Sequence, residues 1–288
     1  MCDEFTSSKD DSATAREGLT RREFAALGTA AALAGYAPRA TAAETLAETM
    51  VEVTTPDGKC DAFFVHPAKG RHPGVLFWPD AFGLRDAKKA MARRLAAAGY
   101  AVLVVNPYYR DVRAPLPFDF SAFRTAEGRE KIMTLMASLT PERVTSDAGA
   151  HVAFLDAQPA VDTKRGIGVQ GYCMGGSITI RSAAAVPSRV KGAATFHGGS
   201  LVTDKPDSPH RLLGQTRASF LIAVARDDDQ KAPGDKDSLR AAAKAAGRPA
   251  EIEVYAGDHS WCVPDAPAYN QPEADRAWAR LLALYSKL

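Results

Sequence analysis

A single cysteine stands in a close frame of glycines at residues 171–176, where the sequence reads GYCMGG. The stretch fits the pattern G-x-S-x-G, with Cys173 in the place of the serine. In that pattern the nucleophile sits on a strained turn between a strand and a helix, and the glycines remove side chains that would collide. The N-terminus of a helix also favours a thiolate. These residues predict that Cys173 is a nucleophile for acyl transfer, against the alternative of a buried structural thiol.

The neighbouring glycines also match the form of a nucleotide-binding loop. Residues 166–171 read GIGVQG, which has the spacing G-x-G-x-x-G. Such a loop needs an apolar strand before its first glycine, but the charged stretch VDTKR precedes Gly166. The apolar residues Ile167 and Val169 fall inside the motif instead. We therefore assign these glycines to a strand that leads into Cys173.

A cysteine nucleophile needs a base, and the elbow motif places an acid and then a histidine downstream. His259, in YAGDHSW, follows the last predicted strand and is the expected base. Three successive aspartates, Asp227, Asp228 and Asp229, follow the predicted strand ASFLIAVA. Asp228 has the spacing that best suits a residue orienting His259, and Asp229 is the competing candidate.

Two other histidines follow Cys173 in the sequence. His197 ends a predicted strand, where it would form part of the pocket wall. His210 lies in the polar stretch SPHRL and is expected in a surface loop. Neither has the position that the elbow motif gives to its base.

The elements that must position these residues are strands alternating with helices. After an opening hairpin, MVEVTTPDGKCDAFFVHP, we predict strands within residues 72–80, 100–110, 165–171, 190–199, 218–228 and 250–257. Helices are predicted within residues 86–98, 120–136, 141–157, 175–186, 236–247 and 273–288. This order indicates an α/β fold with a mainly parallel central sheet and helices on both faces. Functional residues then gather at the carboxyl ends of the strands.

The beginning of the sequence has the pattern of an export signal. Paired arginines, Arg21 and Arg22, precede an apolar stretch from Phe24 to about Ala37. A run of small residues, ATAA, then ends at Ala43 and offers a cleavage site. The order Thr-Arg-Arg-x-Phe is typical of the twin-arginine route. The alternative is an alanine-rich amphipathic helix with two surface arginines.

We therefore predict a twin-arginine-type export signal over residues 1–43 and a mature domain over residues 44–288. That route implies a periplasmic protein that folds before export. The apolar stretch is too short for a spanning helix, so no stable membrane anchor is expected after cleavage.

Charge and cysteine usage exclude several classes of function. The net charge is +2, from 36 basic and 34 acidic residues without a basic stripe, which argues against nucleic-acid binding. Loss of Cys2 with the signal would leave three cysteines, so at least one thiol stays free, while a Cys60–Cys262 pair remains open. No C-x-x-C spacing occurs, and neither a metal nor an organic cofactor is predicted.

At this point the sequence resembles the dienelactone hydrolase family of α/β-hydrolases, from about residue 47 to residue 288. The resemblance rests on four stretches: GYCMGG, PDAFGLRDAKKAMARRLAAAGY, NPYYR and AGDHSW. It implies the α/β-hydrolase fold and attack of Cys173 on a lactone or ester carbonyl to give a thioester. His259 would move the proton and Asp228 would orient it.

The resemblance also implies roles around the nucleophile. Backbone N–H groups of Ala81 and Met174 would form the oxyanion hole. Arg110, in NPYYR, would hold a substrate carboxylate, a task that suits its planar guanidinium. Asp80 and Trp261, together with the pocket histidine His197, complete the expected substrate contacts.

Two positions depart from the family pattern. Asp80 stands where well-known members have a glutamate close to the cysteine, so it either reaches the thiol or caps the adjoining loop. Val263 stands four residues after His259, where those members have a second arginine. One arginine of an anion clamp is therefore missing, and a more neutral ester or lactone is as plausible a substrate as a carboxylated one.

The favoured hypothesis is an exported cysteine-dependent hydrolase that cleaves a small lactone or carboxylic ester, as a monomer or small homo-oligomer. The alternative is a non-catalytic periplasmic binding or thiol-sensing protein on a hydrolase scaffold. A redox enzyme is a weaker option, because no resolving cysteine lies near Cys173 in the sequence.

Overall fold

The computed structural model describes residues 45–288. The predicted export signal, residues 1–43, lies outside the described residues and stays a prediction. None of the helices in the described part of the chain has an apolar stretch long enough to cross a bilayer.

Eight strands form one sheet in the order β1-β2-β4-β3-β5-β6-β7-β8. The first two strands form a hairpin, β2 also pairs antiparallel with β4, and every other pair is parallel. The strands are β1 Leu46–Thr55, β2 Gly58–Pro67, β3 Gly74–Trp78, β4 Ala101–Val105, β5 Ile167–Tyr172, β6 Val190–Phe196, β7 Ser219–Ala225 and β8 Ala250–Tyr255. The mainly parallel sheet that the sequence predicts is confirmed.

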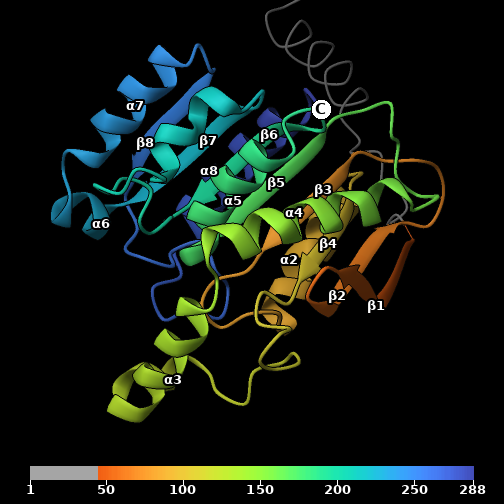
Figure 1. Ribbon diagram of the computed structural model, residues 1–288, viewed down its shortest axis with the longest axis horizontal. Coiled ribbons are helices and arrows are strands. Elements are labelled where there is room, and N and C mark those ends of the chain that lie inside the picture. Colours follow the sequence, from red (N-terminus) through yellow and green to blue (C-terminus); the bar gives the residue numbers. More distant parts are fainter. Residues whose placement is uncertain (1–44) are drawn as a thin grey trace, which may run out of the picture. The chain divides into compact units, whose positions relative to one another are not determined.

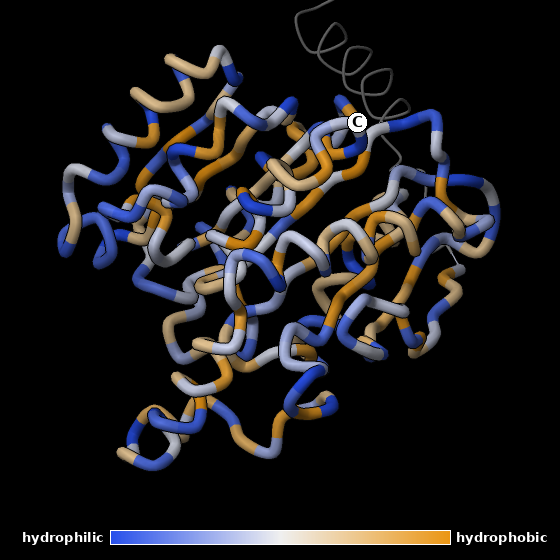
Figure 2. The backbone as a smooth tube through the Cα atoms, in the orientation of Figure 1, coloured by the Kyte–Doolittle hydropathy of each residue, from blue (hydrophilic) through white to orange (hydrophobic). Residues whose placement is uncertain are grey.

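Helices cover both faces of this sheet (Figure 1). Apolar residues of three helices pack on one face: α4 Pro141–Asp156, α5 Met174–Ala185 and α7 Asp235–Ala245. Two helices pack on the other: α2 Asp86–Ala97 and α8 Gln271–Tyr285. Because both faces are covered, the parallel strands are nearly continuously apolar, as the colours along the central strands in Figure 2 show.

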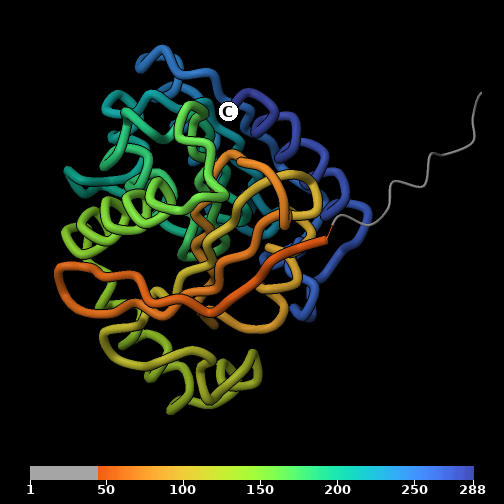
Figure 3. Tube along the Cα trace, turned by 90° about the vertical axis from the view of Figure 1, so that its right-hand side faces the viewer, coloured from red at the N-terminus to blue at the C-terminus, as the bar shows by residue number. Residues whose placement is uncertain are grey.

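The segment between β4 and α4 departs from the predicted single helix over residues 120–136. It contains a 3-10 helix, η1 Phe120–Arg124, and then α3 Ala126–Ala137. Thr125 separates them with an extended backbone (φ −110°, ψ 150°), and its side chain caps α3 by accepting the N–H of Gly128. Figure 1 and Figure 3 both place α3 beyond the ends of the strands rather than against one face of the sheet. This segment therefore brings η1 towards the ends of the strands.

The aspartate-rich stretch after β7 is also helical, where the sequence suggested a loop. It forms the short helix α6 Arg226–Lys231, with all three aspartates in its first turn. Acidic side chains are favoured there because the helix N-terminus is positive. Another 3-10 helix, η2 Pro209–Gln215, follows β6 and contains His210.

Candidate active site

Cys173 lies on a sharp turn between β5 and α5. Its backbone has φ 55° and ψ −118°, in the left-handed region that a side chain other than glycine rarely adopts. The surrounding backbone fixes this conformation, because the Cys173 N–H donates to Phe196 O at 3.1 Å. The Cys173 carbonyl accepts the N–H groups of Gly176 and Gly199, each at 3.0 Å. The strained position places the thiol at the N-terminus of α5, as the glycine pattern predicted.

The glycine frame has a direct steric cause. A Cβ atom on Gly171 would lie 2.0 Å from the carbonyl oxygen of Gly175. One on Gly175 would lie 2.6 Å from Pro79 O, and one on Gly176 would lie 2.5 Å from a backbone Cα. All these neighbours are backbone atoms, which cannot move aside as the end of a flexible side chain can. The three glycines allow α5 to start tightly against β3 and β6.

His259 meets Cys173 from the loop after β8, and Asp228 holds the other side of its ring. Nδ1 of His259 lies 2.6 Å from Asp228 Oδ2, and His259 lines the same pocket as Cys173. Asp227 has a separate task, because its carboxylate accepts the backbone N–H of His259 at 2.7 Å. Asp229 instead pairs with Lys236 Nζ at 2.7 Å. The structure thus places Asp228, and not Asp229, against the histidine.

The surroundings of His259 favour its charged form. Burial by itself disfavours the imidazolium, but the hydrogen bond to Asp228 and the neighbouring Cys173 outweigh it and raise the pKa of His259 to about 10. An imidazolium beside Cys173 can give a proton to a leaving group. The series Asp228–His259–Cys173 is therefore arranged to supply a sulfur nucleophile and a proton donor.

The loop after β3 carries the other expected oxyanion donor, Ala81. Within residues 45–288, the backbone N–H groups of Ala81 and Met174 donate no hydrogen bond. The hydroxyl of Tyr108 donates to Ala81 O at 3.1 Å and also lies 3.1 Å from the sulfur of Met174. Tyr108 therefore links the two residues whose N–H groups would bind an oxyanion. The sequence did not predict this role for Tyr108 in NPYYR, because Ala81 and Met174 are distant from it in the chain.

Asp80 is the centre of a buried group of charges that we name the oxyanion-loop cluster: Asp80, Arg85 and Lys88. The side chain of Asp80 is 3% exposed, and its carboxylate lies 2.7 Å from Lys88 Nζ and 2.8 Å from Arg85. It also accepts the N–H of Phe82 at 3.0 Å. Arg85 is held from its other side by Asp265 at 2.6 Å. The carboxylate thus braces the turn that contains Ala81.

The two cations decide the ionisation of Asp80. Burial alone disfavours its carboxylate, but Lys88 and Arg85 together hold its pKa well below the usual range. Lys88 is fully buried, and its Nζ makes no hydrogen bond of ordinary angle within the described residues despite the close ion pair. That ammonium also lies 4.5 Å from the centre of the Tyr172 ring, a cation–π contact. Asp80 is therefore a charged, sequestered residue.

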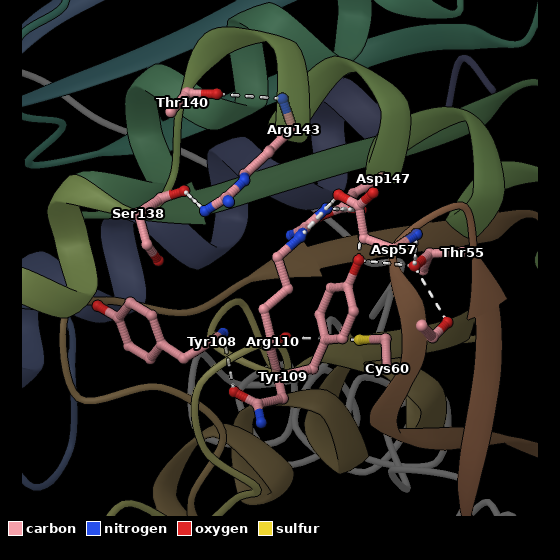
Figure 4. Close-up of polar contacts among 12 residues, drawn as sticks. Thr55, Asp57, Cys60, Tyr108, Tyr109, Arg110, Ser138, Thr140, Arg143 and Asp147 are labelled. Atoms are coloured by element: carbon pink, nitrogen blue, oxygen red, sulfur yellow. Dashed lines mark hydrogen bonds and ion pairs between the residues drawn. The ribbon is translucent and has the colours of Figure 1, made fainter.

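Arg110 belongs to a second group of charges, which we name the hairpin cluster: Asp57, Tyr109, Arg110 and Asp147. Its guanidinium donates to Asp147 in α4 at 2.8 Å and to Asp57, in the β1–β2 turn, at 2.7 Å (Figure 4). The Tyr109 hydroxyl donates to the same Asp147 at 2.9 Å. The structure thus engages Arg110 with protein carboxylates, and Arg110 does not line the pocket beside Cys173.

His197 and Trp261 are buried near the loop that carries His259. His197 is fully buried at the end of β6 with φ 41°, and its ring centroid lies 4.7 Å from that of His259. Burial and the neighbouring charges of His259 and Lys88 hold the pKa of His197 well below its usual range. Trp261 is also fully buried and stacks on Tyr255 at 4.7 Å. Burial behind the histidine loop keeps Trp261 away from the pocket lining.

A pocket of about 230 Å³ opens beside Cys173. It is lined by Asp80, Ala81, Phe82, Phe120, Phe123, Cys173, His259 and Ser260. The Phe82 ring contacts the other two phenylalanines, with ring centroids 4.2 Å from Phe120 and 5.2 Å from Phe123. The sequence did not predict Phe120 or Phe123 in the site, because a long irregular connection separates η1 from β4.

The remaining cysteines do not pair with each other. Cys60, in β2, and Cys262, after the histidine loop, are both free and buried. Burial raises the pKa of each thiol well above the usual range, which keeps both protonated. In the part of the chain that the structure describes, no three histidine, cysteine or acidic side chains are grouped to hold a metal ion.

Comparison with known proteins places this geometry in a family. The sequence model of the dienelactone hydrolase family matches residues 60–288. A candidate carboxymethylenebutenolidase of Methylorubrum extorquens is 30% identical over 80% of this chain and 78% of its own length. A candidate carboxymethylenebutenolidase of Salmonella typhi is 28% identical over 88% and 95%.

A solved structure agrees on the fold. The crystal structure of a candidate dienelactone hydrolase from Klebsiella pneumoniae superposes with a TM-score of 0.73 at 23% identity, over 85% of this chain and 100% of that one. The fold and the sequence match thus agree over nearly the whole described region. The chain belongs to the dienelactone hydrolase family and is a carboxymethylenebutenolidase-like hydrolase.

Proposed function

We propose that this protein hydrolyses small lactones or carboxylic esters through a thioester on Cys173. The observation that carries the proposal is that Asp228 hydrogen-bonds to His259, which lines one pocket together with Cys173 on its strained elbow. The sulfur attacks the substrate carbonyl, and the ester C–O bond then breaks as His259 gives its proton to the leaving oxygen. A lactone opens in the same step and leaves its hydroxyl on the acyl group.

Water completes the proposed cycle. Neutral His259 takes a proton from a water molecule, the hydroxide attacks the thioester, and the acid leaves as the thiolate reforms. The developing oxyanion in both halves would be bound by the free N–H groups of Ala81 and Met174. Asp228 keeps the ring of His259 oriented throughout and stabilises its charged form.

Turnover of p-nitrophenyl acetate tests this proposal. We expect Cys173→Ala and His259→Ala to abolish turnover while circular dichroism and the melting temperature stay near those of the parent. Cys60→Ser is the matched control, because that buried cysteine in β2 is far from the nucleophile in the sheet order. Activity retained in both site variants would reject the proposal. A folded protein that cannot be acylated would favour the non-catalytic binding or thiol-sensing alternative.

We further propose that the hydrolase is exported to the periplasm by the twin-arginine route. The supporting pattern is Arg21-Arg22, the apolar stretch after it and the small residues that end at Ala43. Replacement of both arginines by lysine should keep the full-length precursor in the cytoplasmic fraction while the parent is processed. Unchanged processing and fractionation of the double lysine variant would reject this route.

A further inference from the structure

The pocket beside Cys173 has three phenylalanine side chains in its lining. Phe82 follows β3, whereas Phe120 and Phe123 come from η1 in the distant connection after β4. The ring of Phe82 contacts both of the others, and it meets Phe123 edge to face at 90°. Such a wall suits a flat or branched hydrocarbon group and offers no hydrogen bond from its side chains.

Among the residues that the structure describes, no lysine or arginine lines this pocket. Arg85 is the arginine of the oxyanion-loop cluster, and its guanidinium is bound by Asp80 and Asp265. It lies against the rings of Phe82 and Phe120, at 5.8 and 5.3 Å from their centroids. Two carboxylates thus already bind the N–H groups of this guanidinium, and two aromatic rings lie beside it.

The other positions expected to bind an anion are no more accessible. Arg110 is 10% exposed and held by two aspartates of the hairpin cluster. Val263 stands in the place of the second family arginine and is fully buried in the core. The charged side chains that do line the pocket are Asp80, a carboxylate, and the catalytic His259, which Asp228 already neutralises. A substrate carboxylate in this pocket would therefore be desolvated without a free partner.

We propose that this hydrolase takes neutral esters or lactones whose apolar group packs on Phe82, Phe120 and Phe123, and that it discriminates against carboxylated substrates. This substrate class rests on the proposed ester hydrolysis at Cys173. A desolvated unpaired charge opposes binding in the ground state and the transition state alike, so the discrimination appears in kcat/KM.

Two esters of matched shape test the proposal. Mono-p-nitrophenyl adipate ends in a carboxylate, and p-nitrophenyl 6-methylheptanoate ends in an isopropyl group of similar size on the same chain. The adipate chain is long enough that its carboxylate attacks its own ester only slowly. We expect kcat/KM for the neutral ester to exceed that for the adipate by roughly 100-fold.

A new cation at the wall should reverse part of this preference. Phe123 is 39% exposed, so Phe123→Arg can place a guanidinium at the pocket without burying it. We expect the preference for the neutral ester to fall by about tenfold or more, mainly through faster adipate turnover. Met133→Arg is the matched control, because Met133 is 57% exposed on α3 and does not line the pocket. It adds the same charge to the protein and should leave the preference unchanged.

The outcomes separate the substrate class from the activity on which it rests. Hydrolysis of the adipate as fast as the neutral ester by the parent protein would overturn the substrate class and leave the esterase activity standing. Equal effects of Phe123→Arg and Met133→Arg would also overturn it, since they would mean that long-range attraction alone sets the preference. Hydrolysis of neither ester would overturn the proposed function, and the substrate class with it.

Discussion

The oxyanion-loop cluster and the hairpin cluster follow the adjacent strands β3 and β4, and both bury charged side chains. They differ in what they hold. Asp80 braces the turn of Ala81 at the pocket, whereas Arg110 joins the β1–β2 turn to α4 away from it. A position at the end of a strand is therefore not enough to place a charged side chain in the pocket. Arg110 has such a position, but its ion pairs with Asp57 and Asp147 hold it elsewhere.

The largest effect on stability should come from Asp80→Asn. This change leaves Lys88 and Arg85 buried beside a neutral amide, so the free energy of unfolding should fall by about 3–5 kcal/mol. The loosened turn of Ala81 should also lower kcat by about tenfold or more with a smaller change in KM. Urea unfolding and steady-state kinetics with p-nitrophenyl acetate measure the two effects.

A double replacement separates stability from positioning. Asp80→Leu combined with Lys88→Met removes the fully buried ion pair and leaves Arg85 paired with Asp265, so it should recover stability relative to Asp80→Asn. The turn would still lack the acceptor for the Phe82 N–H, so kcat should stay low. Recovery of kcat together with stability would show that Asp80 acts on the fold alone.

The hairpin cluster should respond differently to loss of its arginine. Arg110→Met leaves Asp147 buried with Tyr109 as its remaining partner, and the free energy of unfolding should fall by about 3 kcal/mol. Because Arg110 does not line the pocket, kcat/KM for a neutral ester should stay within about twofold of the parent value. A loss of kcat/KM as large as that of Asp80→Asn would break the distinction between the clusters.

The sequence predicted the fold and the grouping of Cys173, His259 and Asp228 because both depend on local pattern. Alternating strands and helices, the glycines around Cys173 and the position of His259 after the last strand are all visible in short windows. Asp228 could be preferred over Asp229 from its spacing after Ala225, but only the structure separates their partners.

The partners of charged residues were not predictable in the same way. Lys88 looks like a surface lysine of an amphipathic helix. It is fully buried, however, because Asp80 in the loop after β3 and the ring of Tyr172 in β5 lie against it. Arg110 was expected to bind substrate, and two aspartates distant in sequence hold it instead. Phe123 reaches the pocket through an irregular connection that no periodicity predicts.

The pH dependence of stability should also separate Asp80 from a neutral replacement. The pKa of Asp80 is held well below its usual range in the folded protein, whereas the unfolded chain titrates it near about 3.9. Its contribution is therefore complete above about pH 5 and declines as the pH falls below about 4. Between about pH 5 and 3, the free energy of unfolding should fall more steeply for the parent than for Asp80→Asn. Parallel curves would contradict a charged Asp80 in the folded state.

The smallest expected change in stability comes from a partly exposed ion pair. Asp229 and Lys236 are about a fifth exposed and pair at 2.7 Å without contact to His259. Asp229→Asn should change the free energy of unfolding by about 1 kcal/mol or less and leave kcat unchanged. The same replacement at Asp228 should lower kcat by several orders of magnitude, because the ring of His259 would lose the partner that orients it. Similar losses in both variants would contradict the placement of Asp228 as the orienting acid.

Mass spectrometry of the protein during ester turnover tests the central claim most directly. Rapid acid quenching of the parent protein with p-nitrophenyl acetate should reveal one added acetyl group, located on the peptide that contains Cys173. His259→Ala should accumulate far less of this adduct, and Cys173→Ala none. Turnover by Cys173→Ala, or an acetyl group on another residue during turnover, would contradict a thioester mechanism at this elbow.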